Sequence, residues 1–323
     1  MLRARLCRQL LLEWYQSARR ALPWREGRDP WRILLSEVML QQTRVSAVIP
    51  YYERFLERFP DAGALARATE AEVLTCWSGL GYYSRARNLR RAAQVVVEAG
   101  GFPRDYESIR RLPGIGDYTA AAITSMAFGL PRAAVDGNVV RVLARWLAER
   151  GEVGSAKTRK RIEEAAASLL DRKRPGEFNQ ALMELGATLC LPRDPRCGDC
   201  PLVRSCQARR KGLERELPVK RRRAGPERIA KTLLLIRKGK RILLGRSKMA
   251  GFWELPEAGR LPEAVLGATV ATLRHTITCH QYRLSVARAE IRRIPRGYKW
   301  FAAGKLESIP LATATRKALA RIP

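Results

Sequence analysis

The chain has 323 residues, enough for about two domains with hydrophobic cores of their own. Its 61 lysines and arginines against 31 acidic residues give a formal net charge of +30, which indicates a polyanionic partner, although a general basic bias would also produce it. No apolar run reaches the ~18–20 residues that cross a bilayer, so the composition argues against a helical membrane protein.

The first 206 residues have a helical pattern. Apolar side chains recur at intervals of three and four residues, which predicts helices over 4–19, 31–41, 63–79, 84–99, 118–128, 138–149, 158–171 and 177–189. Asp29 and Pro30 supply an N-cap and a first-turn proline for the second of these helices. Residues 207–228 are rich in arginine and contain two prolines, which predicts a basic linker.

From about residue 229 the apolar period becomes that of strands. Residues 231–237 and 241–246 flank a Lys-Gly-Lys turn, a sequence typical of a β-hairpin, and 276–291 and 298–301 add further strands. The sequence therefore predicts a mainly α-helical domain over 1–206, a linker over 207–228 and a smaller α+β domain over 229–323.

The most informative segment is 112–138. It opens with Leu-Pro-Gly-Ile-Gly-Asp, typical of a tight hairpin leading into a helix, in which Gly114 and Gly116 carry no Cβ and allow another backbone to approach. Free amides at the helix start can hold a phosphate oxygen. A carboxylate beside a bound polyanion is electrostatically costly, so we expect Asp136 to have a chemical role. The hairpin and the Val-Asp-Gly-Asn sequence around Asp136 together resemble the helix-hairpin-helix, Gly/Pro-Asp superfamily of base-excision DNA glycosylases.

Four of the seven cysteines, Cys190, Cys197, Cys200 and Cys206, lie within 17 residues in C-x6-C-x2-C-x5-C spacing. Four thiolates on short, proline-containing loops can converge on one metal centre, and the spacing alone suits zinc and a [4Fe–4S] cluster equally. The same spacing resembles the iron–sulfur loop of the endonuclease III and MutY families in that superfamily. This resemblance favours a [4Fe–4S] cluster that supports the fold and positions DNA.

Hydrolysis of the bond between a purine and deoxyribose requires an acid that protonates the leaving base and an anion near the sugar. Glu37 lies on an otherwise apolar helix face, where a buried carboxylate is costly, although taken alone it would more often be a surface residue. Residues 36–43, Ser-Glu-Val-Met-Leu-Gln-Gln-Thr, resemble the MutY family of adenine DNA glycosylases. The resemblance implies that Glu37 protonates adenine N7 and later activates water. Asp136 would then stabilise or attack the oxocarbenium-like sugar, and Asn138 would orient the water or Asp136.

Tyr118, on the helix after the hairpin, bears on the type of reaction. Bifunctional relatives such as endonuclease III carry a lysine there that forms a Schiff base with the sugar. A tyrosine cannot form one, so the resemblance implies a monofunctional glycosylase that leaves an abasic site. A bifunctional glycosylase/lyase and a DNA-lesion-binding protein without activity are the alternatives.

The resemblance also assigns residues that hold DNA and the flipped base. Gln42 and Tyr82 would fill the gap in the duplex, and Tyr82 would wedge beside the base opposite adenine. The adenine pocket would be formed by Arg20, Trp24, Arg25, Leu40, Val45 and Gln180. Taken singly, Trp24 and Tyr82 would more often be core aromatics.

The C-terminal domain resembles the Nudix-like domain with which the MutY family recognises 8-oxoguanine, through Gly-Phe-Trp-Glu-Leu-Pro at 251–256 and through residues 311–318. A Nudix hydrolase needs a glutamate-rich helix for Mg²⁺, and residues 262–274 contain one acid, so we expect no pyrophosphohydrolase activity. The family reads the lesion with the sequence Phe-Ser-His, and residues 277–280 here are Ile-Thr-Cys-His. Thr278 can supply the hydroxyl of the serine. Cys279 stands at the histidine position unless His280 takes it.

The implied partner is double-stranded DNA that contains A:8-oxoguanine or A:G mispairs. The departure at Cys279 leaves open how strongly the protein prefers 8-oxoguanine over guanine. The basic N-terminus has no small-residue cleavage site, so we expect a monomeric cytoplasmic protein of bacterial type that associates with the nucleoid through DNA binding.

Overall fold

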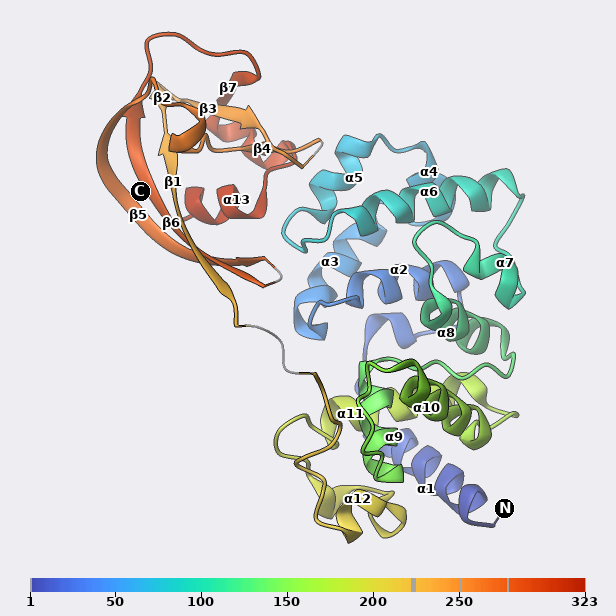
Figure 1. Ribbon diagram of the computed structural model, residues 1–323. Helices are drawn as coiled ribbons and strands as arrows, with labels where there is room; N and C mark the ends of the chain where they lie inside the picture. Colours follow the sequence, from blue (N-terminus) through green and yellow to red (C-terminus); the bar gives the residue numbers. More distant parts are fainter. Residues whose placement is uncertain (1, 222–224, 250, 278, 323) are drawn as a thin grey trace. The chain divides into compact units, whose positions relative to one another are not determined.

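The computed structural model describes residues 2–221, 225–249, 251–277 and 279–322 (Figure 1). They form two compact units, each made of two stretches of chain: Met1–Tyr52 with Val95–Arg222, and Glu53–Gln94 with Arg223–Pro323. The domains predicted from sequence follow chain order, 1–206 and 229–323, and are therefore a different division. Within the described residues, no helix is long and apolar enough to cross a membrane.

The first unit is built from helices. These are α1 (Leu2–Ala18), α2 (Pro30–Leu40), α7 (Tyr106–Arg110), α8 (Asp117–Phe128), α9 (Gly137–Leu147), α10 (Ala156–Leu169), α11 (Pro175–Thr188) and α12 (Gln207–Arg210), with short 3₁₀ turns at Pro23–Arg25, Cys197–Asp199 and Val203–Ser205. Helix α3 (Val45–Arg58) begins in this unit and ends in the second.

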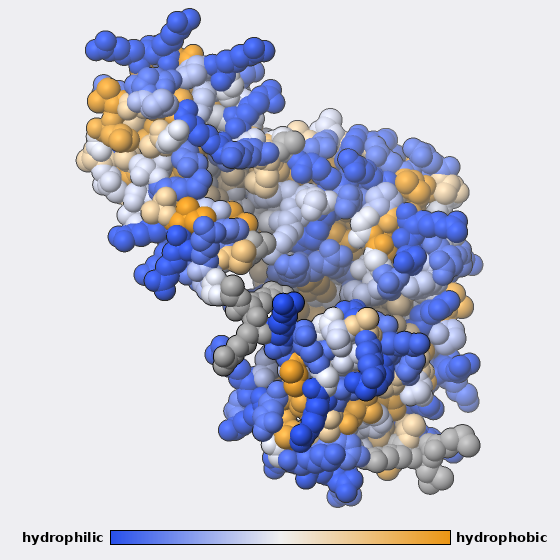
Figure 2. Space-filling view, in the orientation of Figure 1, coloured by the Kyte–Doolittle hydropathy of each residue, from blue (hydrophilic) through white to orange (hydrophobic). Residues whose placement is uncertain are grey.

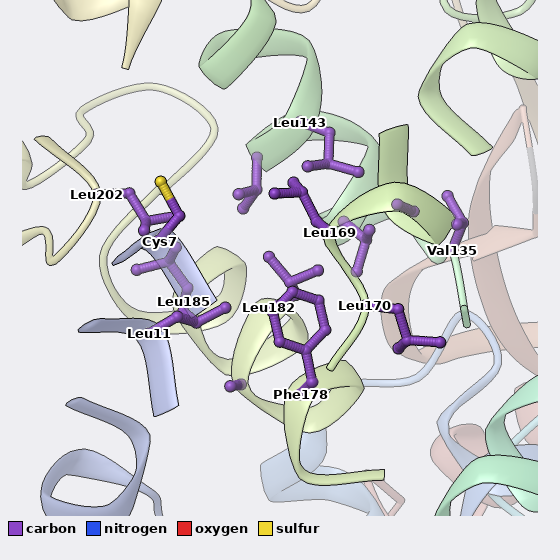
Figure 3. Close-up of a cluster of buried hydrophobic side chains, with 14 of the residues drawn as sticks. Cys7, Leu11, Val135, Leu143, Leu169, Leu170, Phe178, Leu182, Leu185 and Leu202 are labelled. Carbon is purple, nitrogen blue, oxygen red and sulfur yellow. The ribbon is translucent and has the colours of Figure 1, made fainter. Parts of the chain in front are cut away.

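The core of the first unit joins segments that are far apart in the chain. Leu11 of α1 packs in one apolar cluster with Leu143 of α9, Leu169 of α10 and Phe178 of α11, all nearly inaccessible to solvent (Figure 3). Because burying such a side chain contributes about 1.5–3 kcal/mol, this cluster fixes α1 against the three later helices.

Most predicted helices are confirmed to within two residues at either end, and local caps explain their starts. The Asp29 side chain accepts a hydrogen bond from the Trp31 amide at 2.8 Å, and Pro30 occupies the first turn of α2. These contacts satisfy an amide that the helix itself cannot pair.

Several helices differ from prediction. The short helices α7, α12 and α13 (Thr313–Leu319) lie outside the predicted set, and so does α3, which contains Pro50, a residue that removes a backbone donor inside a helix. The predicted helix 63–79 is two helices, α4 (Ala62–Arg67) and α5 (Glu70–Trp77), since Thr69 and Glu72 form a capping box that starts a new helix. Helix α6 (Ser84–Glu98) follows as predicted.

Part of the predicted linker is folded. Ala208, Leu213 and Leu217 are buried and pack against Ala148 and Cys206 of the same unit. The abundance of charged residues in this stretch masked three apolar positions, so the segment free of such packing begins after residue 217.

The second unit combines α4, α5 and most of α6, whose last four residues belong to the first unit, with an α+β region. Its strands are β1 (Glu227–Leu235), β2 (Arg237–Lys238), β3 (Arg241–Arg246), β4 (Trp253–Glu254), β5 (Val265–Ile277), β6 (His280–Glu290) and β7 (Tyr298–Ala302), and its C-terminal helix is α13 (Thr313–Leu319). One sheet has the order β1-β6-β5, and the other joins β2, β3 and β4 with β7 paired to β3. The long, curved strands β5 and β6 are prominent in Figure 1.

The predicted hairpin of 231–237 with 241–246 is confirmed only near its turn. Arg237 and Lys238 pair with β3, and the Leu243 amide donates to the Ile236 carbonyl at 3.0 Å. The rest of the first segment belongs to β1, which pairs parallel with β6. Local alternation in sequence cannot reveal such a partner, because β6 lies about fifty residues further along the chain.

The two stretches of the second unit meet through specific side chains. The rings of Tyr83 and Phe252 lie 4.1 Å apart, and the Tyr83 hydroxyl is 2.8 Å from Thr313 Oγ1. The Ser78 hydroxyl donates to the Leu311 carbonyl at 3.1 Å. These contacts explain why residues 53–94 group with the C-terminal region.

Candidate active site and metal centre

Helix α2 carries Glu37 into the interior of the first unit. The residue is 8% exposed and lies among the buried side chains of the same helix. Burial raises the pKa of this carboxyl to about 7, because the charged form loses solvation; a hydrogen bond from Tyr118 and the charge of Arg25 act in the opposite direction, and Asp136 adds to the rise. At neutral pH Glu37 can therefore give or take a proton.

Asp136 is the N-cap of α9. Its carboxylate accepts a hydrogen bond from the Val139 amide at 2.7 Å and from the Asn138 side-chain amide at 2.9 Å. Burial raises its pKa above the ordinary value, while these two donors limit the rise. The acid is thus held in one orientation by its own helix.

Asn138 is fixed in turn by Arg141, one turn further along α9. The guanidinium donates to Asn138 Oδ1 at 2.9 Å, to the Gly186 carbonyl at 2.7 Å and to the Cys190 carbonyl at 2.8 Å. Arg141 therefore connects the start of α9 with the end of α11 and the first cysteine.

Tyr118 lies on the first turn of α8, next to Glu37. Its hydroxyl donates to Met183 Sδ at 3.6 Å and is close enough to the carboxyl to affect the pKa of Glu37. Figure 1 shows α8 beside α2, which carries Glu37. The structure thus brings together Glu37, Tyr118, Asp136 and Asn138, the four predicted catalytic residues.

An ion-pair network that the sequence did not single out lies in the same unit. Glu184 of α11, fully buried, accepts from Arg20 Nε at 2.7 Å, from Arg20 Nη2 at 2.8 Å and from Arg25 Nη2 at 2.8 Å. Burial alone would raise the pKa of Glu184, but the hydrogen bonds from the two arginines outweigh it and lower the pKa to about 2. A glutamate within an apolar helix is the signal that marked Glu37, and it marks Glu184 equally.

The predicted pocket residues are all half-buried. Arg20 and Arg25 belong to the Glu184 network, and Gln180 accepts a hydrogen bond from the Tyr15 hydroxyl at 2.8 Å. The Trp24 ring lies edge-to-face on Tyr52 at 5.3 Å. Leu40 ends α2 and Val45 begins α3, so these two apolar side chains flank the loop that carries Gln42.

The hairpin before α8 has the predicted geometry. Gly114 adopts a left-handed backbone (φ 79°), the Ile115 amide donates to the Leu112 carbonyl at 3.1 Å, and Gly116 is the N-cap of α8 without a side chain to cover the first amides. The one departure is Asp117, whose carboxylate pairs with Arg110 and accepts from the Tyr106 hydroxyl.

Gln42 and Tyr82 share an unusual backbone. Both are exposed and left-handed, with φ of 56° and 49°, and Ala148 is the third such non-glycine residue in the described chain. Left-handed backbone is strained for side-chain-bearing residues and concentrates at functional sites. In the second unit Arg85 holds the Tyr82 loop, since its guanidinium donates to the Gly81 carbonyl at 3.1 Å and lies 5.4 Å from the Tyr82 ring.

The four clustered cysteines line one cavity, together with Val142, Leu189 and Leu202. Arg145 donates to Cys190 Sγ at 3.3 Å and to the Leu191 carbonyl at 2.7 Å, which fixes the first thiol. Within the described residues, no three Cys, His, Asp or Glu side chains converge closely enough for a single metal ion. Thiolates are ligands for both zinc and iron–sulfur clusters, so the residues that line this cavity fit either kind of centre.

The predicted lesion-reading residues lie at the turn between β5 and β6. Cys279 is exposed, and His280 Nε2 is 3.1 Å from Glu227 Oε2. Thr278 lies outside the described residues. The segment 262–274, where a Nudix hydrolase would have its acidic helix, forms most of strand β5.

Known DNA repair proteins are similar to this chain. A family model described as "HhH-GPD superfamily base excision DNA repair protein" matches residues 35–171. Human adenine DNA glycosylase is 44% identical over 218 residues, covering 64% of this chain and 40% of the human protein. The Buchnera aphidicola (strain Bp) adenine DNA glycosylase is 40% identical over 203 residues, covering 62% of this chain and 57% of that protein. The chain thus spans about two fifths of the mammalian relatives and less than two thirds of the bacterial one.

Solved structures extend the comparison. A thermostable thymine-DNA glycosylase superposes with a TM-score of 0.60 at 31% identity, covering 65% of this chain and 97% of that one. A trapped endonuclease III–DNA intermediate shares the fold, with a TM-score of 0.55 at 24% identity. The hairpin, the N-capping aspartate and these matches establish that the chain belongs to the helix-hairpin-helix (HhH-GPD) superfamily of base excision DNA repair proteins.

Proposed function

We propose that the protein is an adenine DNA glycosylase, which hydrolyses the bond between adenine and deoxyribose in mispaired duplex DNA. The observation that carries the proposal is the buried Glu37 carboxyl, whose pKa of about 7 lets it deliver a proton at neutral pH. Its neighbour Asp136 is an anion of the kind that release of a purine requires near the sugar, and the curated adenine DNA glycosylases are 36–46% identical over their matched parts.

Release of adenine proceeds in two stages in this proposal. Protonated Glu37 donates to adenine N7, so that the base leaves without a full negative charge. Asp136, oriented by Val139 and Asn138, stabilises the positive charge that develops on the sugar. Glu37, now a carboxylate, accepts a proton from water that attacks the sugar, and this returns the enzyme to its starting state.

Tyr118 determines where the reaction stops. A phenol cannot form a Schiff base with the sugar, so the product is an abasic site with both DNA strands intact. The remaining site residues fit a flipped base: Trp24 and Leu40 would hold its faces, and Arg20, Arg25, Val45 and Gln180 would surround its edges. Gln42 and Tyr82 would enter the duplex. Both residues are exposed and have a strained, left-handed backbone.

The mispair would be read from the strand opposite adenine. At the β5–β6 turn Cys279 is exposed and His280 is half-buried, and the domain that contains this turn would act as a Nudix-like reader of 8-oxoguanine or guanine. The four thiols would hold a [4Fe–4S] cluster. Such a cluster would fix the loop of 190–206 and the Cys190 carbonyl to which Arg141 donates.

Base release from four duplexes tests the proposal. We expect adenine to be released opposite 8-oxoguanine and guanine, much more slowly opposite cytosine and thymine, and without strand cleavage until alkali is added. A protein–DNA adduct trapped by borohydride would support the bifunctional alternative. Full activity of E37Q would remove Glu37 from its role, and absence of base release from every duplex would support the non-enzymatic alternative.

A further inference from the structure

Three arginines of the second unit surround a surface cavity that takes no part in the site described above. Arg274 lies on β5, Arg283 lies directly opposite it on β6, and Arg321 follows helix α13. Together with Thr272 and Leu273, these side chains line one cavity, and all three arginines are exposed. The β5–β6 pairing and the packing of Ala318 with Leu273 and Leu284 hold them in place.

The cavity concentrates positive charge that the fold does not neutralise. Like charges directly opposite each other on neighbouring strands repel. Elsewhere in this unit, Lys231 pairs with Glu257 and Arg260 pairs with Glu254. Within the described residues none of the three cavity arginines forms an ion pair. An external anion would relieve the repulsion.

The donors around the cavity suit a phosphodiester. A guanidinium donates two parallel hydrogen bonds to a phosphate, and a threonine hydroxyl such as that of Thr272 adds a further donor. Strand β5 is the edge of the sheet, so its outer backbone amides have no neighbouring strand in the order β1-β6-β5. The side chains of the described residues that line the cavity are hydrogen-bond donors or apolar, and none is an acid.

We propose that Arg274, Arg283 and Arg321 form a phosphate-binding site for the backbone of the DNA strand opposite the excised adenine. This inference rests on the proposed function. The paired residues Ile277 and His280, at the turn expected to contact the opposite base, are three residue pairs from the Arg274–Arg283 pair. That separation is about 10 Å, or about three base-pair steps along a duplex axis. A phosphate held there would set the register of the β5–β6 turn on the strand without reading a base.

The test compares two triple variants that remove the same charge. One is R274Q/R283Q/R321Q, and the control is R288Q/R292Q/R293Q, which changes three exposed arginines of the same unit outside the cavity. Equilibrium binding to an A:8-oxoguanine duplex and to an undamaged duplex is measured over a range of salt concentrations. For the cavity variant we expect the slope of log K against log salt to fall by about 1 for each phosphate that the protein no longer binds.

The expected decrease in affinity is the same for both duplexes, because phosphates carry no sequence information. Equal slopes and affinities for the two variants would overturn the proposal, and so would a decrease confined to the 8-oxoguanine duplex. Thermal unfolding should show the cavity variant no less stable than the control, since the substitution removes a repulsion.

Adenine release by the saturating control variant in a single turnover should match that of the parent chain, because its three substitutions lie outside both the cavity and the candidate active site. If the parent chain releases no adenine, the proposed function fails, while the comparison of salt slopes still decides the phosphate site.

Discussion

At the scale of single residues, the burial of Glu37 acts in opposite directions on activity and on stability. A carboxyl with its pKa at about 7 is protonated and able to act as an acid below that pH. Above that pH the carboxyl is ionised, and the folded state must then accommodate a poorly solvated charge. Activity and stability should therefore both depend on pH through this one group.

The first prediction concerns E37Q. In the parent chain the single-turnover rate of adenine release should fall about tenfold for each pH unit above about 7, as the acid form of Glu37 is lost.

The same group affects stability. Because the pKa of Glu37 in the folded state is raised from 4.5 to about 7, the carboxyl lowers the free energy of unfolding progressively between these pH values and fully above pH 7, by about 3 kcal/mol. E37Q should lose activity yet unfold at higher denaturant concentration than the parent at pH 8, with little difference near pH 4. Equal stabilities at pH 8 would contradict the raised pKa.

Tyr118 gives a second prediction at this scale. The hydroxyl lowers the pKa of Glu37, so Y118F should raise that pKa further and shift the falling limb of the pH–rate profile to higher pH. The product should still be an abasic site, since no amine is introduced. A limb that moves to lower pH would show that the hydroxyl does not stabilise the Glu37 carboxylate.

The sequence predicted these residues unequally well. Glu37 and Asp136 lie in short motifs, where a carboxylate in an apolar or phosphate-facing setting draws attention. Glu184 has no such motif, and its importance depends on Arg20 and Arg25, which lie about 160 residues earlier in the chain. Nothing local specifies that pairing. The roles of all the predicted site residues stay predictions until the variants are measured.

At the scale of elements, the contact between α11 and α9 controls the position of Asp136. A Cβ added to Gly186 would lie 2.6 Å from Asn138 Cβ and 3.2 Å from its Cα, so the helices meet where only glycine fits. Asn138 in turn holds the Asp136 carboxylate.

The third prediction is that G186A lowers the single-turnover rate at least tenfold, because the start of α9 must move and misplaces Asp136. A187S is the matched control, since Ala187 is the next residue and is exposed on the same helix. The control should keep the parental rate. If G186A and A187S behave alike, close packing at this point has no effect on the chemistry.

The fourth prediction concerns the link between α11 and the N-terminal segment. E184Q leaves two partly buried guanidinium groups without their carboxylate and should lower the free energy of unfolding by about 3 kcal/mol. E177Q, on the first turn of the same helix, removes an exposed pair with Arg174 and should change it by less than about 1 kcal/mol. Denaturant titration measures both, and similar values would show that the network does not stabilise the unit.

Element boundaries were predictable where a cap or a period marked them, as at Asp29 and in α6. They failed where two signals conflicted. Pro50 hid α3, and an apolar period that continues across Thr69 hid the break between α4 and α5. The capping box at Thr69 and Glu72 was a readable signal for that break.

At the scale of the whole molecule, the net charge and composition predicted a hydrophilic surface, but the sequence did not predict which distant segments contact one another. Hydrophilic residues cover most of the face in Figure 2, as the net charge of +30 leads one to expect. The grouping of 53–94 with the C-terminal region and the parallel pairing of β1 with β6 are contacts between distant segments. Sequence periodicity reports which face of an element is buried, but not against what.

The fifth prediction belongs to this scale, because α1 completes the core of the first unit. L11A removes a side chain that is 1% exposed and should lower the free energy of unfolding by about 3 kcal/mol. L6A, on the same helix but 56% exposed, should change it by less than about 0.5 kcal/mol. Unfolding monitored in denaturant gives both values, and equal effects would place α1 outside the cooperative core.

The dependence of α1 on α11 has a consequence for how the protein is made. Tyr15 and its partner Gln180 are 165 residues apart in the chain. At about 5–20 residues per second, a ribosome needs roughly ten to thirty seconds to deliver the second after the first. During most of that interval Leu11, Leu12 and Tyr15 have no core to enter, because α9 and α10 emerge late in it and α11 emerges last. The nascent chain therefore carries an apolar helix that is not fully covered until α11 emerges. The first unit is therefore a candidate client for chaperones that act at the ribosome, even though its finished fold buries this surface completely.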